Sequence, residues 1–226
     1  MEDGKVMINI LYEDNHLLVV EKPVGVLSQA DSSNTLDMLT ILKKYIKEKY
    51  NKPGNVYLGL VHRLDKNVGG VMVFAKTSKA AKRLSEEIRN KKVKKTYLAI
   101  CKGIIKEDGK YEDYLEREEY RSKISTKEKG KIATLTYKVL DTKENETLVK
   151  INLETGRHHQ IRVQFSSHNY PLLGDDKYGT KGKYEVALYA YKLSFYHPTT
   201  KEKLEFTLLP KEGYFKSWSK NLNFLK

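Results

Sequence analysis

Short segments with strand periodicity, interrupted by only a few helices, constrain the fold of this chain more than any other feature. Alternating or short continuous apolar runs indicate strands in the segments 8–21 (a hairpin), 57–61, 70–75, 133–139, 149–153, 189–195 and 204–208. Apolar residues at helical spacing predict helices over about 35–50, 78–90 and 157–168, with Asn34 and Ser78 capping the first two. Since strands and helices do not alternate regularly, the pattern predicts an α+β fold with a mostly antiparallel mixed sheet and flanking helices.

The length of the chain is sufficient for one sizeable core. Its 226 residues, 39% of them hydrophobic, lie within the range of one domain, so we expect a single domain over residues 1–226. Residues 107–130 are strongly charged and weakly periodic, which predicts an exposed excursion or a flexible loop.

A formal net charge of +13 indicates an anionic partner such as a nucleic acid or a membrane surface, or a solvated lysine-rich surface. Cys101 is the only cysteine, which excludes an intramolecular disulfide and fits a reducing compartment. The first residues are acidic and polar, and no apolar run approaches the roughly 20 residues that span a bilayer. We therefore expect a cytoplasmic protein without membrane attachment.

The positive charge is concentrated between Lys76 and Lys95. This segment holds nine basic residues and only two acidic ones, Glu86 and Glu87. On one helix and its exit loop, such a segment predicts a strip that follows nucleic-acid phosphates. A solvated helix face is the alternative, and peripheral membrane attachment a weaker one, because the segment lacks the Trp and Phe of interfacial helices.

Two motifs carry candidate chemistry. His62-Arg63-Leu64-Asp65 is similar to a kinase catalytic loop, but the chain has neither an N-terminal glycine-rich phosphate loop nor an Asp-Phe-Gly. The segment Gly156–Arg162 contains adjacent histidines, which point about 100° apart on a helix and are therefore poor paired metal ligands. No metal site is expected.

Several blocks, in order, resemble the signatures of RluA-type pseudouridine synthases. The blocks are Ile10–Asp14, Glu21-Lys22-Pro23-x-Gly25, His62–Lys66 with Gly70 and Phe74–Thr77, Lys95-x-Tyr97-Leu98-Ala99, Thr155-Gly156-Arg157-x-His159-Gln160-Ile161-Arg162, Pro171–Asp175, Tyr178-Gly179 and His197-Pro198. They extend over almost the whole chain, which makes a chance match very improbable. The chain is thus identified as a member of this family, in a short form without an N-terminal S4 domain.

This resemblance implies a central catalytic cleft in which uridine is isomerised to pseudouridine. The reaction has no net redox change and needs no cofactor, but it needs a carboxylate beside the sugar. The resemblance assigns that carboxylate to Asp65, its cationic partner to Arg162, and the contact with the uracil ring to Tyr97. Whether Asp65 attacks the sugar, attacks the base or removes a sugar proton stays open.

RNA is the implied partner, with ribosomal and transfer RNA both open. Because a stacked uridine hides its reactive atoms, the enzyme must flip it out, and the resemblance implies that Arg63 fills the vacated space or holds the flipped nucleotide. The further expected RNA contacts are Lys76, Lys92, Lys95, Arg157 and His159. No protein partner is predicted, and the resemblance suggests a monomer.

The chain departs from the family pattern at two places. Val68-Gly69-Gly70 stands where Thr-Ser-Gly is common, and His158 replaces a Thr. These changes remove hydroxyl groups near the catalytic loop and support an alternative, a non-catalytic RNA-binding or ribosome-assembly protein that retains the fold.

Overall fold

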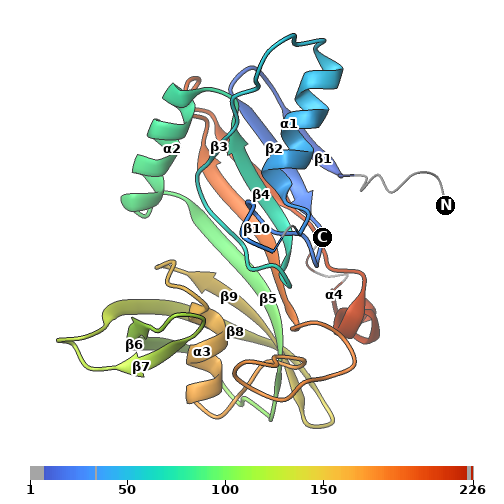
Figure 1. Ribbon diagram of the computed structural model, residues 1–226. Coiled ribbons are helices and arrows are strands. Elements are labelled where there is room, and N and C mark those ends of the chain that lie inside the picture. Colours follow the sequence, from blue (N-terminus) through green and yellow to red (C-terminus); the bar gives the residue numbers. More distant parts are fainter. Residues whose placement is uncertain (1–7, 34, 223–224, 226) are drawn as a thin grey trace. The chain divides into compact units, whose positions relative to one another are not determined.

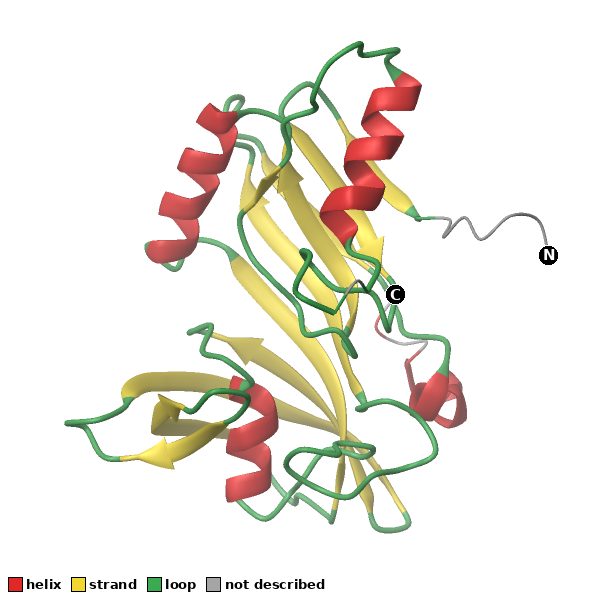
Figure 2. Ribbon diagram, in the orientation of Figure 1, coloured by secondary structure: helices red, strands yellow, loops and turns green. Residues whose placement is uncertain are grey.

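The computed structural model describes residues 8–33, 35–222 and 225. Its chain divides into two compact units, which Figure 1 colours along the sequence and Figure 2 by secondary structure. Unit 1 contains the chain up to Val93 and Leu193–Leu208, and unit 2 contains Lys94–Lys192 and the chain from Leu209 onward. Both units combine sheet with a few helices, so the predicted α+β class is confirmed. The expectation of a single domain stays a prediction.

Unit 1 is built on a sheet in which the strands follow the order β1–β2–β4–β10. Their bounds are Ile10–Glu13 for β1, Leu17–Lys22 for β2, Gly69–Ala75 for β4 and Leu188–Tyr196 for β10, of which unit 1 holds the part from Leu193. Two short strands add to it, β3 (Gly59–Leu60) beside β4 and β11 (Lys203–Thr207) beside β10. The β1–β2, β2–β4 and β3–β4 pairs are antiparallel, which confirms the predicted N-terminal hairpin.

Both faces of the central strands of unit 1 are buried. Leu17 and Val19 of β2 form one core cluster with residues of β4 and with Leu84 of helix α2 (Ser78–Arg89). Leu18 and Val20, which point to the opposite face because side chains alternate along a strand, are also fully buried. This explains why β2 reads as a continuous apolar run and not as an alternating one.

Helix α1 is shorter than its periodicity predicts. It spans Met38–Lys49 and not 35–50, and Asp37 caps it by accepting the backbone N–H of Thr40. Asn34, the predicted cap, lies outside the described residues. An aspartate at this position satisfies one of the N–H groups that a helix start leaves without an intrahelical acceptor.

Tertiary pairing sets the start of α1. Leu27 donates its N–H to the carbonyl of Leu36 and accepts the N–H of Met38, which holds the residues before the helix extended. Such a contact between distant segments leaves no trace in local periodicity. The cap of α2 also differs from the prediction, because Thr77 and not Ser78 accepts the N–H in the first turn.

Unit 2 contains a second run of strands, in the order β10–β5–β9–β8–β6–β7. The bounds are Lys94–Lys102 for β5, Glu146–Leu153 for β9, Lys131–Lys143 for β8, Gly109–Arg117 for β6 and Ser122–Ser125 for β7. Neighbours from β5 to β7 in this order are antiparallel. The structure confirms the predicted strands β8 and β9, whereas β5 was not predicted.

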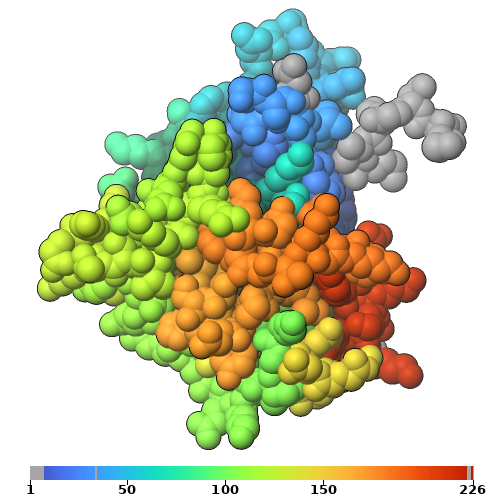
Figure 3. Space-filling view, turned by 60° about the horizontal axis from the view of Figure 1, so that its bottom comes forward, coloured from blue at the N-terminus to red at the C-terminus, as the bar shows by residue number. Residues whose placement is uncertain are grey.

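Residues 107–130 were predicted to be an exposed excursion or a flexible loop, and of these alternatives the flexible loop is wrong. This segment contains β6 and β7, which form a hairpin, and β6 also pairs with β8. Tyr111 and Leu115 of β6 are buried, while charged residues occupy exposed positions between and beyond them. High charge at the exposed positions hid the alternation of the sequence. Figure 3 shows the yellow-green atoms of this segment at the surface of the molecule.

Helix α3 spans Gln160–Ser167 and packs Val163 against Leu115 of β6 and Ala133 of β8. It begins later than residue 157 because His159 has a φ of +53°, in the left-handed region that a right-handed helix does not use. The chain ends with a 3₁₀ helix, Gly213–Trp218, and the short α4, Ser219–Leu222, neither of which was predicted.

Asp14 organises the turn of the N-terminal hairpin. Its carboxylate accepts the backbone N–H groups of His16 and Leu17, and it lies 2.8 Å from Nε2 of the buried His197. Nδ1 of His197 accepts the backbone N–H groups of Thr199 and Thr200, so the imidazole joins two turns of unit 1. Two of the blocks found in the sequence therefore have a structural explanation.

Glu13 joins β1, α1 and the end of β4. Its carboxylate accepts hydrogen bonds from Lys49, Lys76, Tyr45 and Tyr50, and only 7% of its side chain is exposed. Burial on its own would raise the pKa of Glu13, but these hydrogen bonds outweigh burial and lower the pKa to about 2. An ionised Glu13 therefore stabilises unit 1.

Glu13→Gln is expected to destabilise the protein by roughly 1–3 kcal/mol at neutral pH, because the two lysines lose their carboxylate. The lowered pKa means that this contribution is complete above about pH 4.5, the ordinary value, and is lost as the pH falls towards 2. Denaturant unfolding between pH 2 and 7 measures the difference between wild type and variant. The exposed Glu86→Gln serves as the control, and a Glu13→Gln difference no larger than the control at pH 7 would contradict the assignment.

Candidate active site

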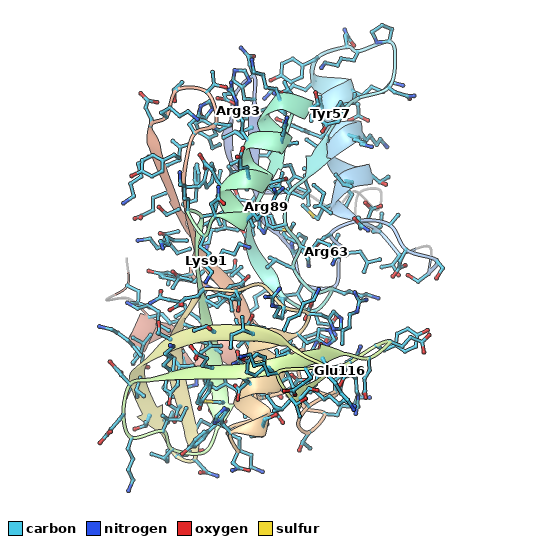
Figure 4. All side chains as sticks on the ribbon, turned by 90° about the vertical axis from the view of Figure 1, so that its left-hand side faces the viewer. Tyr57, Arg63, Arg83, Arg89, Lys91 and Glu116 are labelled. Carbon is cyan, nitrogen blue, oxygen red and sulfur yellow. The ribbon has the colours of Figure 1, made fainter. Side chains whose placement is uncertain are left out.

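The loop between β3 and β4 carries the predicted catalytic carboxylate. Asp65 is partly exposed within this loop, whereas its neighbour Leu64 and the nearby Val68 are buried. The N–H of Val68 donates to the carbonyl of Asp65, which closes a tight turn after the carboxylate. Val68, one of the departures from the family pattern, fills an apolar position here. The loop presents Asp65 and the exposed Arg63, which Figure 4 labels, from a turn whose apolar residues are anchored in unit 1.

Buried groups fix the loop on both sides of Asp65. Before Asp65, the hydroxyl of Ser28 donates to the carbonyl of Leu64 at 2.7 Å and accepts the N–H of Leu64 at 3.0 Å. After Asp65, the carbonyl of Lys66 accepts the N–H of Gly25 and the ammonium of Lys22. Such fixed backbone on either side of a side chain is the arrangement that an active site requires.

His62 anchors the start of the loop. Its Nε2 accepts the backbone N–H of Val73 in β4 at 3.1 Å. This contact gives His62 a role in holding the loop against β4.

Lys22 is a cation of unit 1 on which the charge of Asp65 acts. Its side chain is completely buried at the end of β2, a strand whose preceding residues are mostly apolar. Burial lowers the pKa of Lys22 to about 7, and the negative charge of Asp65 opposes this lowering. In the sequence, Lys22 occurs only as part of a motif. A lysine that ends a strand of otherwise mostly buried apolar residues was the available signal.

In unit 2, Arg162 is held by a carboxylate that the sequence analysis did not assign. Its Nε and Nη2 donate to the two oxygens of Asp175 at 2.8 and 2.6 Å, and both side chains are buried. The planar guanidinium suits this bidentate contact. Asp175 also accepts the backbone N–H of Tyr178, and the ring of Tyr178 lies under the guanidinium of Arg162 at 5.4 Å. Asp175 and Tyr178 both lie in motif blocks that resemble the family, and this was the available indication of their role.

The histidines before α3 join this group. Nδ1 of His159 lies 2.9 Å from the hydroxyl of Tyr178, and the rings of His158 and His159 are stacked. Ser122, the first residue of β7, binds His158 through its hydroxyl and donates its N–H to Tyr178. His158, the second departure from the family pattern, therefore links the β6–β7 hairpin to the start of α3.

Tyr97 and Lys95 lie two residues apart on β5 and so point to the same face of the strand. Tyr97 is buried and is paired in register with Ile151 of β9. Burial lowers the pKa of Lys95, which lies next to the turn at Gly156. Arg157, in the same turn, donates from Nε to the carbonyl of Ile132, so its guanidinium is tied to β8.

The basic segment 76–95 separates into two groups. Lys76 is bound to Glu13 at 2.8 Å with 10% of its side chain exposed, and Arg83 donates to the carbonyl of Pro198. The exposed members are Lys79, Lys82, Arg89, Lys91, Lys92 and Lys94. Figure 4 shows Arg83, Arg89 and Lys91 along α2 and its exit. The exposed group remains available to bind phosphates, whereas the charge of Lys76 is already balanced within unit 1.

The predicted site residues are thus divided between the two units. Asp65 and Arg63 belong to unit 1, with Lys76 and Lys92, while Tyr97, Arg162, Lys95, Arg157 and His159 belong to unit 2. The cleft that would unite Asp65, Tyr97 and Arg162, and the pairing of Asp65 with Arg162, stay predictions. Within the described residues, no three His, Cys, Asp or Glu side chains are grouped so that they could hold a metal ion, and no helix has the length and hydropathy to cross a membrane.

Solved structures share this fold. The human RNA pseudouridylate synthase domain containing 4 aligns with a TM-score of 0.77 and 24% identity, over 96% of this chain and 92% of the human chain. The human RNA pseudouridylate synthase domain containing 1 aligns with a TM-score of 0.73 and 22% identity, over 98% and 97% of the two chains.

Sequence comparison extends the likeness. An uncharacterized RNA pseudouridine synthase of Aquifex aeolicus is 37% identical over 92% of this chain and 71% of its own length. The ribosomal large subunit pseudouridine synthase C of Buchnera aphidicola is 34% identical over 94% of this chain and 70% of its own length. Residues 16–167 match the family described as RNA pseudouridylate synthase. With this match and these relatives, the chain belongs to the RNA pseudouridylate synthase family, of the RluA type.

Proposed function

We propose that this chain isomerises uridine to pseudouridine in ribosomal or transfer RNA, with the carboxylate of Asp65 acting on a flipped-out nucleotide. The observation that carries the proposal is the loop around Asp65, in which buried contacts fix the backbone on both sides of a partly exposed carboxylate. The membership of the family supports the same reaction. The relatives named for the large ribosomal subunit favour ribosomal RNA as the first substrate to test.

The chemistry follows from what each group can offer. Cleavage of the N1–C1′ bond leaves an electron-poor ribose and a detached uracil, and a fixed carboxylate beside the sugar stabilises or traps that state. A loop that cannot shift keeps the carboxylate in place while the uracil turns and rejoins through C5. Because the atoms of product and substrate are the same, this sequence of bond changes consumes no co-reactant.

The remaining residues have proposed supporting roles. Arg63 is exposed beside Asp65 in the chain, so its guanidinium can occupy the space that a flipped nucleotide leaves or can bind its phosphate. Tyr97 would lie against the uracil ring. Arg162 would orient the carboxylate of Asp65 from a position that Asp175 and Tyr178 already fix. The contacts from Lys92, Lys95, Arg157 and His159 to RNA belong to the same proposal.

Asp65→Asn is expected to lower turnover on the order of a thousandfold or more and to leave RNA affinity nearly unchanged, because the amide keeps the shape but not the charge. Carbodiimide labelling followed by primer extension detects pseudouridine, which has the mass of uridine. The exposed Asp31→Asn in the same unit is the matched control and should turn over normally. An Asp65→Asn variant with normal turnover would refute the mechanism, and a wild type that binds RNA but modifies no transcript would favour a non-catalytic RNA-binding protein.

The exposed cations after α2 are expected to contribute to the salt dependence of RNA binding. Replacing Lys91 and Lys92 by Gln should reduce the slope of log K against log salt by about 1–2, since each phosphate contact contributes about 0.7–0.9. The control carries the same two changes at Lys43 and Lys47, which are exposed on α1. Filter binding of a ribosomal RNA fragment measures the slopes of both double variants. The salt concentration runs from about 50 to about 300 mM, roughly the range in which such slopes are linear. Equal slopes for the two double variants would exclude this segment as a phosphate-binding surface.

A further inference from the structure

The buried ammonium of Lys22 needs an explanation, because an ionised group without solvent is costly unless it is paired or hydrogen-bonded. Lys22 is the last residue of β2, opposite Gly70 of β4, and its exposed fraction is 0%. Its Nζ donates to the carbonyl of Pro23 at 2.9 Å and to the carbonyl of Lys66 at 3.1 Å. Both acceptors are neutral, so these bonds alone do not balance the charge.

The charge that acts on Lys22 is that of Asp65. Burial lowers the pKa of Lys22 to about 7, and Asp65 is the group whose charge raises it again. The carbonyl of Lys66 follows Asp65 directly in the chain, so the same ammonium binds the backbone beside Asp65 and interacts electrostatically with its carboxylate. The side chain of Lys66 itself is exposed, so its ammonium is not a buried charge like that of Lys22.

Lys22 differs in this respect from Arg162, the predicted partner of Asp65. The guanidinium of Arg162 is bound bidentately by Asp175, a carboxylate of its own unit. Lys22 donates to two carbonyls, and the charge of Asp65 in the same unit raises its pKa. An ammonium with neutral acceptors leaves more of its charge to act on a nearby anion than a guanidinium that already binds a carboxylate.

We propose that Lys22 is a positioning residue for Asp65: its buried ammonium holds the backbone that follows the carboxylate and acts on the carboxylate with its positive charge. This inference rests on the proposed catalytic role of Asp65. Ser28 fixes the opposite side of the same loop without any charge. A comparison of Lys22 with Ser28 therefore distinguishes the effect of the backbone hydrogen bonds from the effect of the charge.

The first test does not need activity. In ¹³C- and ¹⁵N-labelled protein, the side-chain signal of Lys22 is the one that disappears in Lys22→Met. It should titrate near neutral pH in the wild type and at lower pH in Asp65→Asn, because the carboxylate that favours the ammonium is gone. Asp31→Asn should leave the midpoint in place. An unchanged midpoint in Asp65→Asn would overturn the proposal, whether or not the protein forms pseudouridine.

The second test compares the two anchors in single-turnover kinetics. Lys22→Gln keeps a hydrogen-bond donor and removes the charge, so it should lower the rate about tenfold or more without weakening RNA binding. Its activity should also be lost at a higher pH on acidification than that of the wild type. Ser28→Ala should lower the rate without shifting this pH dependence.

Melting temperatures show whether both variants are folded. A folded Lys22→Gln with the rate and pH profile of the wild type would overturn the proposal, as would a shift of the profile of equal size in Ser28→Ala. If Lys22→Gln does not fold, the titration decides. If the wild type lacks activity, the proposed function fails, while the titration still decides whether Lys22 and Asp65 interact.

Discussion

The attachment of the loop 62–68 to the end of β2 and to the segment that follows β2 is the constraint on which the site depends. Lys22 and Gly25 bind one carbonyl of the loop, and Ser28 binds both backbone groups of Leu64. Since β2 and β4 are buried on both faces, these anchors cannot move without opening the core of unit 1. The carboxylate of Asp65 thus takes its position from contacts with the buried core of its unit.

Unit 2 fixes Arg162 by a different means. A buried bidentate ion pair with Asp175 and the ring of Tyr178 hold the guanidinium, and Tyr178 in turn contacts His159 and Ser122. A buried ion pair contributes little net stability, but removing one partner leaves a costly uncompensated charge. The network therefore serves geometry more than stability, and it ties the β6–β7 hairpin to the same arginine.

The blocks that identify the family separate by physical role. Asp14 and His197 join two turns, and Glu13 gathers two lysines and two tyrosines, so these residues maintain unit 1. The charge of the segment 76–95 separates likewise: Lys76 and Arg83 bind groups of their own unit, while the cations from Arg89 to Lys94 are exposed. A motif or a basic run thus contains structural and functional residues side by side.

The sequence by itself determined the α+β class, the strands β1, β2, β4, β8, β9, β10 and β11, and the family, because apolar periodicity and ordered motifs are local properties of the chain. It could not show β6 and β7, whose charged exposed positions hide the alternation, nor the start of α1, which pairing with Leu27 sets. Only tertiary structure decided that the ammonium of Lys22 binds the backbone of the loop that carries Asp65, and that Asp175 holds Arg162. The reason is physical: the partner of a buried charge is chosen by proximity in space, which local sequence does not encode.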